Sequence, residues 1–299
     1  MLSFHEITLS DRSLIMQWAQ KAEISLSNYG FGHMFMWDHY YRMEMALYEG
    51  ALFFRYADPA REGGPFMSCP VAIDMPLGDA IALAIDHQRQ QGLVERVYSV
   101  PEMWLQRIMD ENPDRFNYKE SPDFADYVYD RQALSELRGK ALHSKRNHVN
   151  RFVVEYPDFV YRALNGADLD ECLDMHSQWW AERDNDEAYA PERGAIQRVV
   201  QHMQDLDARG GGIWIGGKLV AMTIATPLTQ GSVDVNVEKA LSGYNGLYSA
   251  INQQFCEKTL GDIQWVNREE DMGLEGLRRA KQSYHPAFML KKFTFSLKE

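Results

Sequence analysis

Three adjacent carboxylates, Glu269, Glu270 and Asp271, follow a short apolar run that is predicted to be a strand. In α/β folds, ligands bind at the carboxyl ends of strands. Adjacent carboxylates repel each other, so one of them would hold a proton more tightly and could accept one from an amine nucleophile. One could instead pair with the ammonium of an aminoacyl group. A second interpretation is purely structural, with the three residues capping the next helix.

The helix expected directly after these carboxylates, residues 275–283, carries more groups of the same kind. Arg278 and Lys281 share one of its faces at a spacing of three residues. Tyr284, which precedes a His-Pro pair, could protonate a leaving group. In the structural interpretation the cations of this helix are simply solvated.

A basic segment, residues 134–153, is predicted to form one long helix. At 100° per residue, Leu142, Val149 and Val153 fall on one narrow apolar stripe, the side that packs against a core. Four cations of the segment are candidates for holding an anionic ligand. Three border the stripe and one lies on the far face, in the order Arg138, Lys145, Arg146 and Arg151. The alternative is a surface helix whose cationic heads stay in water while their stems cover apolar surface.

The segment Gly243-Tyr244-Asn245-Gly246 separates a predicted strand from a predicted helix. Such a junction exposes free backbone N–H groups at the positive end of a helix dipole, which suits an anion. An ordinary strand-to-helix turn explains the same residues, because the lysine-serine pair of a phosphate-binding loop is missing.

The composition excludes several classes of protein. A formal charge of −12 over 299 residues argues against broad binding to nucleic acid or to anionic membranes. Cys69, Cys172 and Cys256 are too few and too scattered for a disulfide framework or a zinc site. His33 and His39 stand among aromatic residues and are expected to be packing residues. We therefore predict no metal and no tightly bound cofactor.

The cellular location follows from what the sequence lacks. The first residues do not have the charged-then-apolar layout of a signal peptide. No run approaches the about 20 apolar residues that a membrane-spanning helix needs. A soluble protein in a reducing cytoplasm is expected.

Alternating strand and helix signals predict a mixed α+β (α/β) layer fold in two parts, residues 1–130 and 131–299. Expected strands cover residues 41–47, 51–56, 66–73, 96–100, 126–129, 159–163, 213–215, 219–227, 232–237, 263–267 and 289–297. Expected helices cover residues 9–22, 76–91, 101–110, 134–153, 169–182, 192–208, 245–259 and 275–283. A break is expected at residues 210–212, three consecutive glycines.

Four segments together resemble a known family. They read DYVYD (126–130), LRGKALHSKRNHVNRF (137–152), VNVEKALSGYNGLYSAIN (235–252) and VNREEDMGLEGLRRAKQSYHP (266–286). This combination is similar to the DUF2156 family, bacterial proteins that resemble the C-terminal catalytic domain of phosphatidylglycerol lysyltransferases. The resemblance covers essentially the whole chain. It implies a tandem pair of GNAT-like (acyl-CoA N-acyltransferase) domains, with the active site in the second.

The resemblance also implies transfer of an acyl or aminoacyl group from an activated ester or thioester to a nucleophile. The donor would be an acyl-CoA or an aminoacyl-tRNA. Residues 243–246 match the place where GNAT-like folds meet the donor's phosphates, although the usual Q/R-x-x-G-x-G/A pattern is absent. The basic segment would contact the phosphates of a tRNA acceptor end. A lipid acceptor is not expected, because the charge is acidic and the membrane-spanning half of the lipid-modifying enzymes is missing.

Two alternatives belong to other functional classes. The first is a non-catalytic ligand-binding or regulatory protein that keeps the fold and senses an acyl-CoA, nucleotide or aminoacyl ligand. The second is a protein-interaction scaffold that binds a partner through exposed aromatic residues in residues 28–41. The three hypotheses predict different results. A transferase turns its substrate over, and a ligand-binding protein binds without turnover. A scaffold forms a complex and has no affinity for small molecules.

Overall fold

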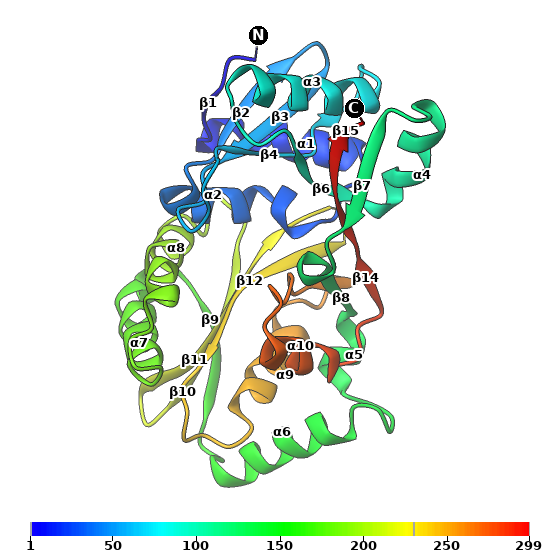
Figure 1. The fold of residues 1–299 in the computed structure, drawn as a ribbon. Helices are drawn as coiled ribbons and strands as arrows, with labels where there is room; N and C mark the ends of the chain where they lie inside the picture. The colour runs from blue at the N-terminus through cyan, green and yellow to red at the C-terminus, as the bar shows by residue number, and fades with distance from the viewer. Residues whose placement is uncertain (1, 230, 299) are drawn as a thin grey trace.

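A computed structural model describes residues 2–229 and 231–298 of the chain. It contains two β-sheets, each flanked by helices, one above the other in Figure 1. The first sheet has the order β1-β2-β3-β4-β6-β15-β7, with β5 paired to β3. Its strands are β1 (His5–Glu6), β2 (Glu44–Tyr48), β3 (Ala51–Tyr56), β4 (Phe66–Ser68), β5 (Val71–Ala72), β6 (Val97–Pro101), β7 (Phe116–Glu120) and β15 (Lys292–Leu297). The accompanying helices are α1 (Arg12–Lys21), α2 (Phe31–Tyr41), α3 (Leu77–Gln90) and α4 (Glu102–Glu111).

The second sheet has the order β14-β8-β13-β12-β11-β10-β9. Its strands are β8 (Asp126–Asp130), β9 (Val160–Leu164), β10 (Arg209–Ile215), β11 (Lys218–Pro227), β12 (Ser232–Ala240), β13 (Trp265–Asn267) and β14 (Phe288–Leu290). Its helices are α5 (Arg131–Glu136), α6 (His143–Glu155), α7 (Leu169–Ala181), α8 (Ala190–Gln201), α9 (Leu247–Lys258) and α10 (Glu275–Gln282). The central strand β11 is almost entirely buried, as expected for a sheet that helices cover on both faces.

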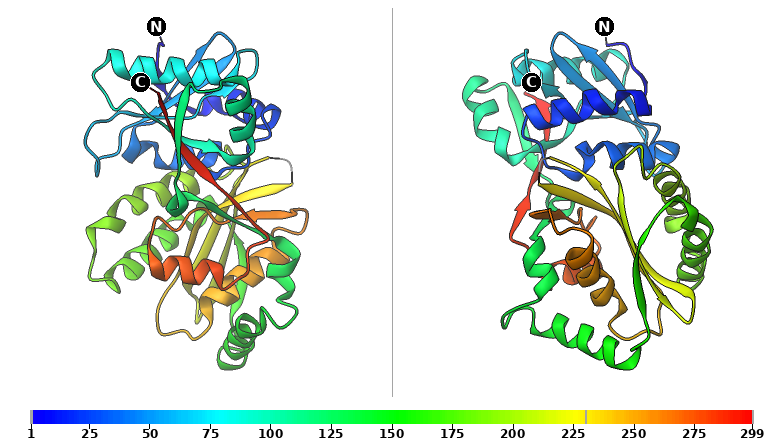
Figure 2. Two further views of the ribbon diagram at one scale, coloured as in Figure 1. Left: turned by 45° about the vertical axis from the view of Figure 1, so that its right-hand side comes forward. Right: turned by 180° about the vertical axis from the view of Figure 1, so that it is seen from behind.

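The two sheets exchange strands. The strand expected at residues 289–297 is two strands, because β14 pairs with β8 in the second sheet while β15 pairs with β6 and β7 in the first. In Figure 2, β15 runs from the lower half of the molecule into the upper half. The boundary predicted near residue 130 falls at the end of β8, itself a strand of the second sheet.

The basic segment is two helices rather than the single helix expected. The chain leaves α5 at Leu137, which has a left-handed backbone (φ 49°), and Gly139 is also left-handed (φ 82°). An α-helix cannot continue through such residues. The buried face also differs from the prediction, since Leu142 and Val149 are buried but Val153 is 43% exposed and Phe152 lies in the core.

Two other expectations about the second half are wrong. The helix expected to end at residue 208 ends at Gln201. The glycines at 210–212 lie inside β10 rather than at a break. They serve close packing: a Cβ atom on Gly211 would lie 2.3 Å from the Tyr161 hydroxyl, and one on Gly212 would lie 2.5 Å from the Trp214 ring. A side chain there would displace its neighbours.

The aromatic segment expected to bind a partner forms helix α2, which is largely buried. It packs against α8 and β11 of the second half. A Cβ atom on Gly32 would lie 2.3 Å from the Thr226 hydroxyl, so helix and sheet are in direct contact. The premise of the scaffold hypothesis, an exposed aromatic surface, is therefore wrong.

In residues 2–229 and 231–298, none of the helices combines the length and the apolar character that crossing a bilayer requires.

Candidate functional site

The site begins where β12 and β13 part. These strands pair in parallel only at residues 232–234 and 265–267, whereas β12 continues to Ala240. Beyond residue 234, no backbone hydrogen bonds of the sheet join β12 to the segment after β13 within the described residues. Side chains of the two segments face each other there. We name five residues there the gap cluster: Lys145 of α6, Glu238 of β12, Asn252 of α9, Arg268 after β13 and Tyr284 after α10.

An ion pair bridges the parted strands. Arg268 Nη2 lies 2.5 Å from Glu238 Oε1, and the Asn252 amide donates to Glu238 Oε2 at 3.0 Å. The side chains of Arg268 and Glu238 are 12% and 13% exposed. Among the described residues, Arg268 Nη1 is buried without a partner, as are Asn252 Oδ1 and the hydroxyl of Thr223, which pairs with Glu238 across the sheet. Unsatisfied buried polar atoms of this kind commonly mark a place where a ligand or water binds.

A second cation enters the gap cluster from the basic segment. Lys145 Nζ lies 4.0 Å from the centroid of the Tyr284 ring, and the Arg268 guanidinium lies 4.8 Å from the same centroid. Burial lowers the pKa of Lys145, and the Arg268 charge lowers it further. Two cations thus face one carboxylate, Glu238, so the cluster carries net positive charge and favours an anion.

Tyr284 is a buried ring in this cluster. Its hydroxyl donates to Ser249 Oγ at 3.3 Å, and burial raises its pKa. The phenol is therefore in contact with two cations through its ring; its expected role as a proton donor stays a prediction.

The other cations of the basic segment lie elsewhere. Arg138 is 80% exposed and pairs with Glu136. Arg146 donates to the carbonyl of Leu137 at 2.5 Å, so it caps the end of α5. Arg151 is exposed. Of the four predicted donor contacts in this segment, Lys145 alone joins the gap cluster.

The glycine segment before α9 lies under α6. A Cβ atom on Gly246, the left-handed N-cap of α9, would lie 2.2 Å from the backbone oxygen of His148. Tyr244 stacks near Tyr156, and Asn245 donates to Glu155 at 3.3 Å. Gly243 is open, with no atom within 4 Å of a Cβ built there. The start of α9 is therefore in contact with α6, the helix that supplies Lys145.

The three adjacent carboxylates have different partners. Asp271 accepts from Arg278 Nε at 2.9 Å and from the Tyr127 hydroxyl at 2.6 Å. The hydrogen bond from Arg278 is the main reason that the pKa of Asp271 falls to about 2. Burial opposes ionisation of Glu270, but the charges of Lys292, His33 and Lys281 together outweigh it and lower the pKa of Glu270. Both are anions held by cations, which makes them poor proton acceptors.

Lys281 and Lys292 hold the loop after β13 in place. Lys281 Nζ donates to the backbone oxygens of Arg268 and Glu270, each at 2.5 Å. Lys292 Nζ lies 2.7 Å from Asp126 and 3.2 Å from Glu270. Lys281 therefore holds the loop in place through contacts with its backbone.

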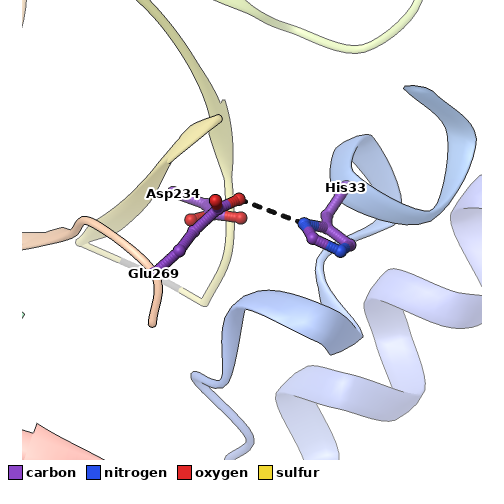
Figure 3. A group of neighbouring side chains, drawn as sticks. All are labelled: His33, Asp234 and Glu269. Carbon is purple, nitrogen blue, oxygen red and sulfur yellow. Dashed lines mark hydrogen bonds and ion pairs between the residues drawn. The ribbon is translucent and has the colours of Figure 1, made fainter. Parts of the chain in front are cut away.

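Glu269, the third carboxylate, points to the opposite face of the sheet. Its Oε1 lies 3.1 Å from His33 Nδ1 on α2, close to Asp234 of β12 (Figure 3). We name His33, Asp234 and Glu269 the interface triad. One ligand atom from each lies within 4.8 Å of the others, so the triad could hold a metal ion. The left-handed backbone of Glu269 (φ 57°) is the kind of strain that concentrates at functional sites.

Asp234 is fully buried in the triad. Asn236 donates to its Oδ2 at 2.8 Å, whereas Oδ1 has no partner among the described residues. Burial raises the pKa of Asp234, and the neighbouring Glu269, Asp126 and Glu270 raise it further. The surroundings therefore oppose ionisation of Asp234, while Glu269 pairs with the His33 imidazole.

A β-bulge puts the two clusters on opposite faces. In a regular strand, Asp234 and Glu238 would share a face, because side chains alternate with a period of two. The pairing with β11 shifts between two successive pairs, Ile224↔Val237 and Ala225↔Val235. The extra residue, Asn236, reverses the alternation. Glu238 consequently meets α9 and Arg268, and Asp234 meets α2.

Residue spacing did not reveal several members of these clusters. His33 and Asp234 of the interface triad, and Arg268 of the gap cluster, meet partners from distant parts of the chain. Their signal in the sequence was weak: Asp234, Asn236 and Glu238 are polar residues at alternate positions of a strand that is otherwise apolar. Such residues cost free energy when they are buried without partners.

The comparison with solved structures defines the class of protein. A tandem GNAT protein from the clavulanic acid biosynthesis pathway is similar over 99% of this chain and 98% of its own, with a TM-score of 0.53 and 12% identity. The expected fold is thus confirmed as a mixed α+β pair of GNAT-like domains.

The particular family follows from a match to the family model "Phosphatidylglycerol lysyltransferase, C-terminal" over residues 20–295. The chain belongs to this family, as the sequence resemblance predicted. A conserved protein of unknown function from Bacteroides thetaiotaomicron is 31% identical over the full length of both chains, with a TM-score of 0.91. The C-terminal domain (DUF2156) of a putative lysylphosphatidylglycerol synthetase from Agrobacterium fabrum is 12% identical over 96% of this chain and 93% of its own, with a TM-score of 0.64.

An uncharacterised protein of Mycoplasmoides gallisepticum is 21% identical over 168 residues. The match spans 56% of this chain and about half, 54%, of that relative.

Proposed function

We propose that this chain is an acyl- or aminoacyltransferase whose gap cluster holds the activated donor. The family and the fold are those of acyl- and aminoacyltransferases. The observation that carries the proposal is the buried, unpartnered Nη1 of Arg268 beside a second cation, Lys145. The donor would be an acyl-CoA or an aminoacyl-tRNA, and a cytoplasmic location is part of the proposal.

The gap cluster suits the chemistry of acyl transfer. When a nucleophile attacks an ester or thioester carbonyl, negative charge develops on the carbonyl oxygen. Donors that are already fixed in a site from which water is excluded stabilise that charge. Arg268 is fixed by Glu238, and Lys145 is held over the Tyr284 ring. As the bond to the leaving oxygen or sulfur breaks, Tyr284 would supply the proton. Glu269 remains a predicted proton acceptor or ammonium partner on the other face of β12.

A second candidate is a ligand-binding protein without turnover. One observation favours it: none of the three predicted carboxylates belongs to the gap cluster, and its own carboxylate, Glu238, is paired with Arg268. Such a site binds an anion but has no evident proton acceptor next to it.

The experiment combines binding with turnover. Acetyl-CoA, lysyl-tRNA and alanyl-tRNA are titrated into the purified protein, and free thiol or deacylated tRNA is then measured with a primary amine as acceptor. Lys145→Ala is expected to weaken donor binding about tenfold or more, because a partly buried charge contact is lost. Arg138→Ala, which removes an exposed cation of the same segment, is the matched control and should change binding less than about twofold.

The outcomes separate the two candidates. Binding with product release supports the transferase. Binding that Lys145→Ala weakens, with no release for any donor, supports the ligand-binding protein. Equal effects of Lys145→Ala and Arg138→Ala would remove the gap cluster from either function.

A further inference from the structure

The carboxylates around the interface triad outnumber the cationic groups that pair with them. Four carboxylates meet there: Asp126, Asp234, Glu269 and Glu270. Glu269 pairs with the His33 imidazole, and two ammonium groups lie nearby. Lys292 pairs with Asp126 and Glu270, and Lys281 donates to backbone oxygens. Within the described residues, neither forms an ion pair with Asp234 or Glu269.

One carboxylate oxygen of Asp234 lacks any partner that the structure describes. Asp234 is 0% exposed, and its Oδ1 has no hydrogen-bond partner among residues 2–229 and 231–298. The Asn236 amide satisfies only Oδ2. A buried carboxylate oxygen without a partner is costly, so a positively charged ligand at this place would remove a penalty that the fold otherwise carries.

We propose that the interface triad binds one divalent first-row transition metal ion, such as Zn²⁺ or Mn²⁺, through His33, Asp234 and Glu269. An imidazole with two carboxylates is a ligand set that such ions accept. Each residue offers one ligand atom, and the three atoms lie within 4.8 Å of one another. Water would complete the coordination.

The packing around the triad favours a small ion over a larger cationic ligand. A Cβ atom on Gly30, just before α2, would lie 2.7 Å from the Leu228 side chain and 3.9 Å from Asp234 Oδ2. The contact of Gly32 with Thr226 closes the next turn of the helix against the sheet. The backbone of α2 is therefore in close contact with the sheet beside the triad.

The ion would join the two halves of the molecule. His33 comes from α2, which lies between α1 and β2 in the chain. Asp234 lies on β12 of the second sheet, and Glu269 lies in the loop after β13 (Figure 3). Glu269 would then be a metal ligand rather than the proton acceptor expected from the sequence. Its strained backbone would serve to aim a ligand.

The test uses the full chain and metal ions as probes. The purified protein is stripped with a chelator, dialysed against Zn²⁺, Mn²⁺ or Co²⁺ in turn, and analysed for bound metal and melting temperature. We expect one ion per chain and a higher melting temperature with metal. Asp234→Asn and His33→Gln should each abolish stoichiometric binding. The matched control is His202→Gln, which removes a histidine from a different His–carboxylate pair, 2.9 Å from Asp205.

The wild-type protein alone keeps the proposal falsifiable if these variants fold poorly. Co²⁺ bound by imidazole and carboxylates gives visible absorption, and anomalous scattering from a Zn²⁺ crystal locates the ion. Density between the three side chains supports the proposal. Absence of binding by all three ions overturns it, as does an ion located elsewhere. Stabilisation by lysine amide that Asp234→Asn abolishes, without metal binding, would overturn it in favour of an ammonium site.

Discussion

The two faces of β12 carry clusters of opposite electrostatic character. On the α9 face, Arg268 and Lys145 outnumber the single carboxylate Glu238. On the α2 face, Glu269 pairs with the His33 imidazole, and Asp234 has no ion-pair partner within the described residues. The polypeptide thus places a cation-rich cluster and a carboxylate-rich cluster on the two faces of a single strand. In the proposed reaction, the gap cluster would hold an anionic donor, and the interface triad would hold a cationic or metal-bound group on the other face of the same strand.

The clusters also differ in how their charge is held. In the gap cluster, Lys145 is a flexible side chain resting on an aromatic ring, and its removal leaves no buried charge unpaired. Around the interface triad the charges are buried and interlocked, with Lys292 only 3% and Asp126 0% exposed. We therefore expect substitutions around the triad to affect stability most, and substitutions at Lys145 to affect binding.

The largest effect is expected for Lys292→Met. The change leaves Asp126 and Glu270 without their cation, and breaking a buried ion pair costs about 3–5 kcal/mol of the free energy of unfolding. Urea denaturation measures the loss. Lys298→Met, whose partner Asp114 is 94% exposed, is the control and should cost less than about 1 kcal/mol. Similar losses for the two variants would mean that the buried pair is no more important than a surface pair.

The next effect is expected for Arg268→Met, which leaves Glu238 buried and unpaired. We expect a loss of about 3 kcal/mol. Adding Glu238→Gln to this variant should restore more than half of the loss, since the double variant carries no unpaired charge. If the double variant is as unstable as the single one, shape rather than charge governs this side of β12.

A smaller effect is expected for Gly246→Ala. Its left-handed backbone costs about 1–2 kcal/mol for a residue with a side chain, and the added Cβ would lie 2.2 Å from the His148 oxygen. Gly243→Ala has the same backbone strain (φ 84°) without the contact, so it is the matched control. A larger loss for Gly246→Ala, measured by denaturation, would confirm that α6 rests on the start of α9. Equal losses would argue that α6 moves freely.

The smallest effect concerns pH. The charged form of Lys145 is the one that attracts an anion, and burial lowers its pKa below the ordinary value of 10.5. Donor affinity should therefore fall, by about tenfold, as pH rises through this lowered pKa. Lys145→Arg should keep its affinity over the same range, because a guanidinium stays protonated. Binding isotherms at several pH values test this. Identical pH profiles for the two proteins would exclude Lys145 as the titrating group.

The sequence predicted the family and the mixed fold correctly. Motif and periodicity sufficed for β12, β13 and the glycine segment before α9, because these signals are local. The single helix over residues 134–153 was wrong because left-handed residues at 137 and 139 interrupt it. Periodicity does not report such breaks.

The interface triad could not be predicted from the sequence, for a different reason. His33 is more than 200 residues from Asp234 and precedes Glu269 by 236 positions. Its aromatic neighbours suggested a packing residue. The bulge at Asn236 was equally hidden, since it depends on the pairing with β11. Without the bulge, the alternation of Asp234, Asn236 and Glu238 predicts one polar face where the molecule has two.

The exchange of strands between the sheets has a consequence for biosynthesis. The strand β15, which fills the place between β6 and β7 of the first sheet, is synthesised only after all the strands of the second sheet. Until then the first sheet has an unfilled position, so the first half cannot be completed as an independent nascent unit. Pulse-labelled translation intermediates that end just before residue 292 should therefore be sensitive to protease in the first half.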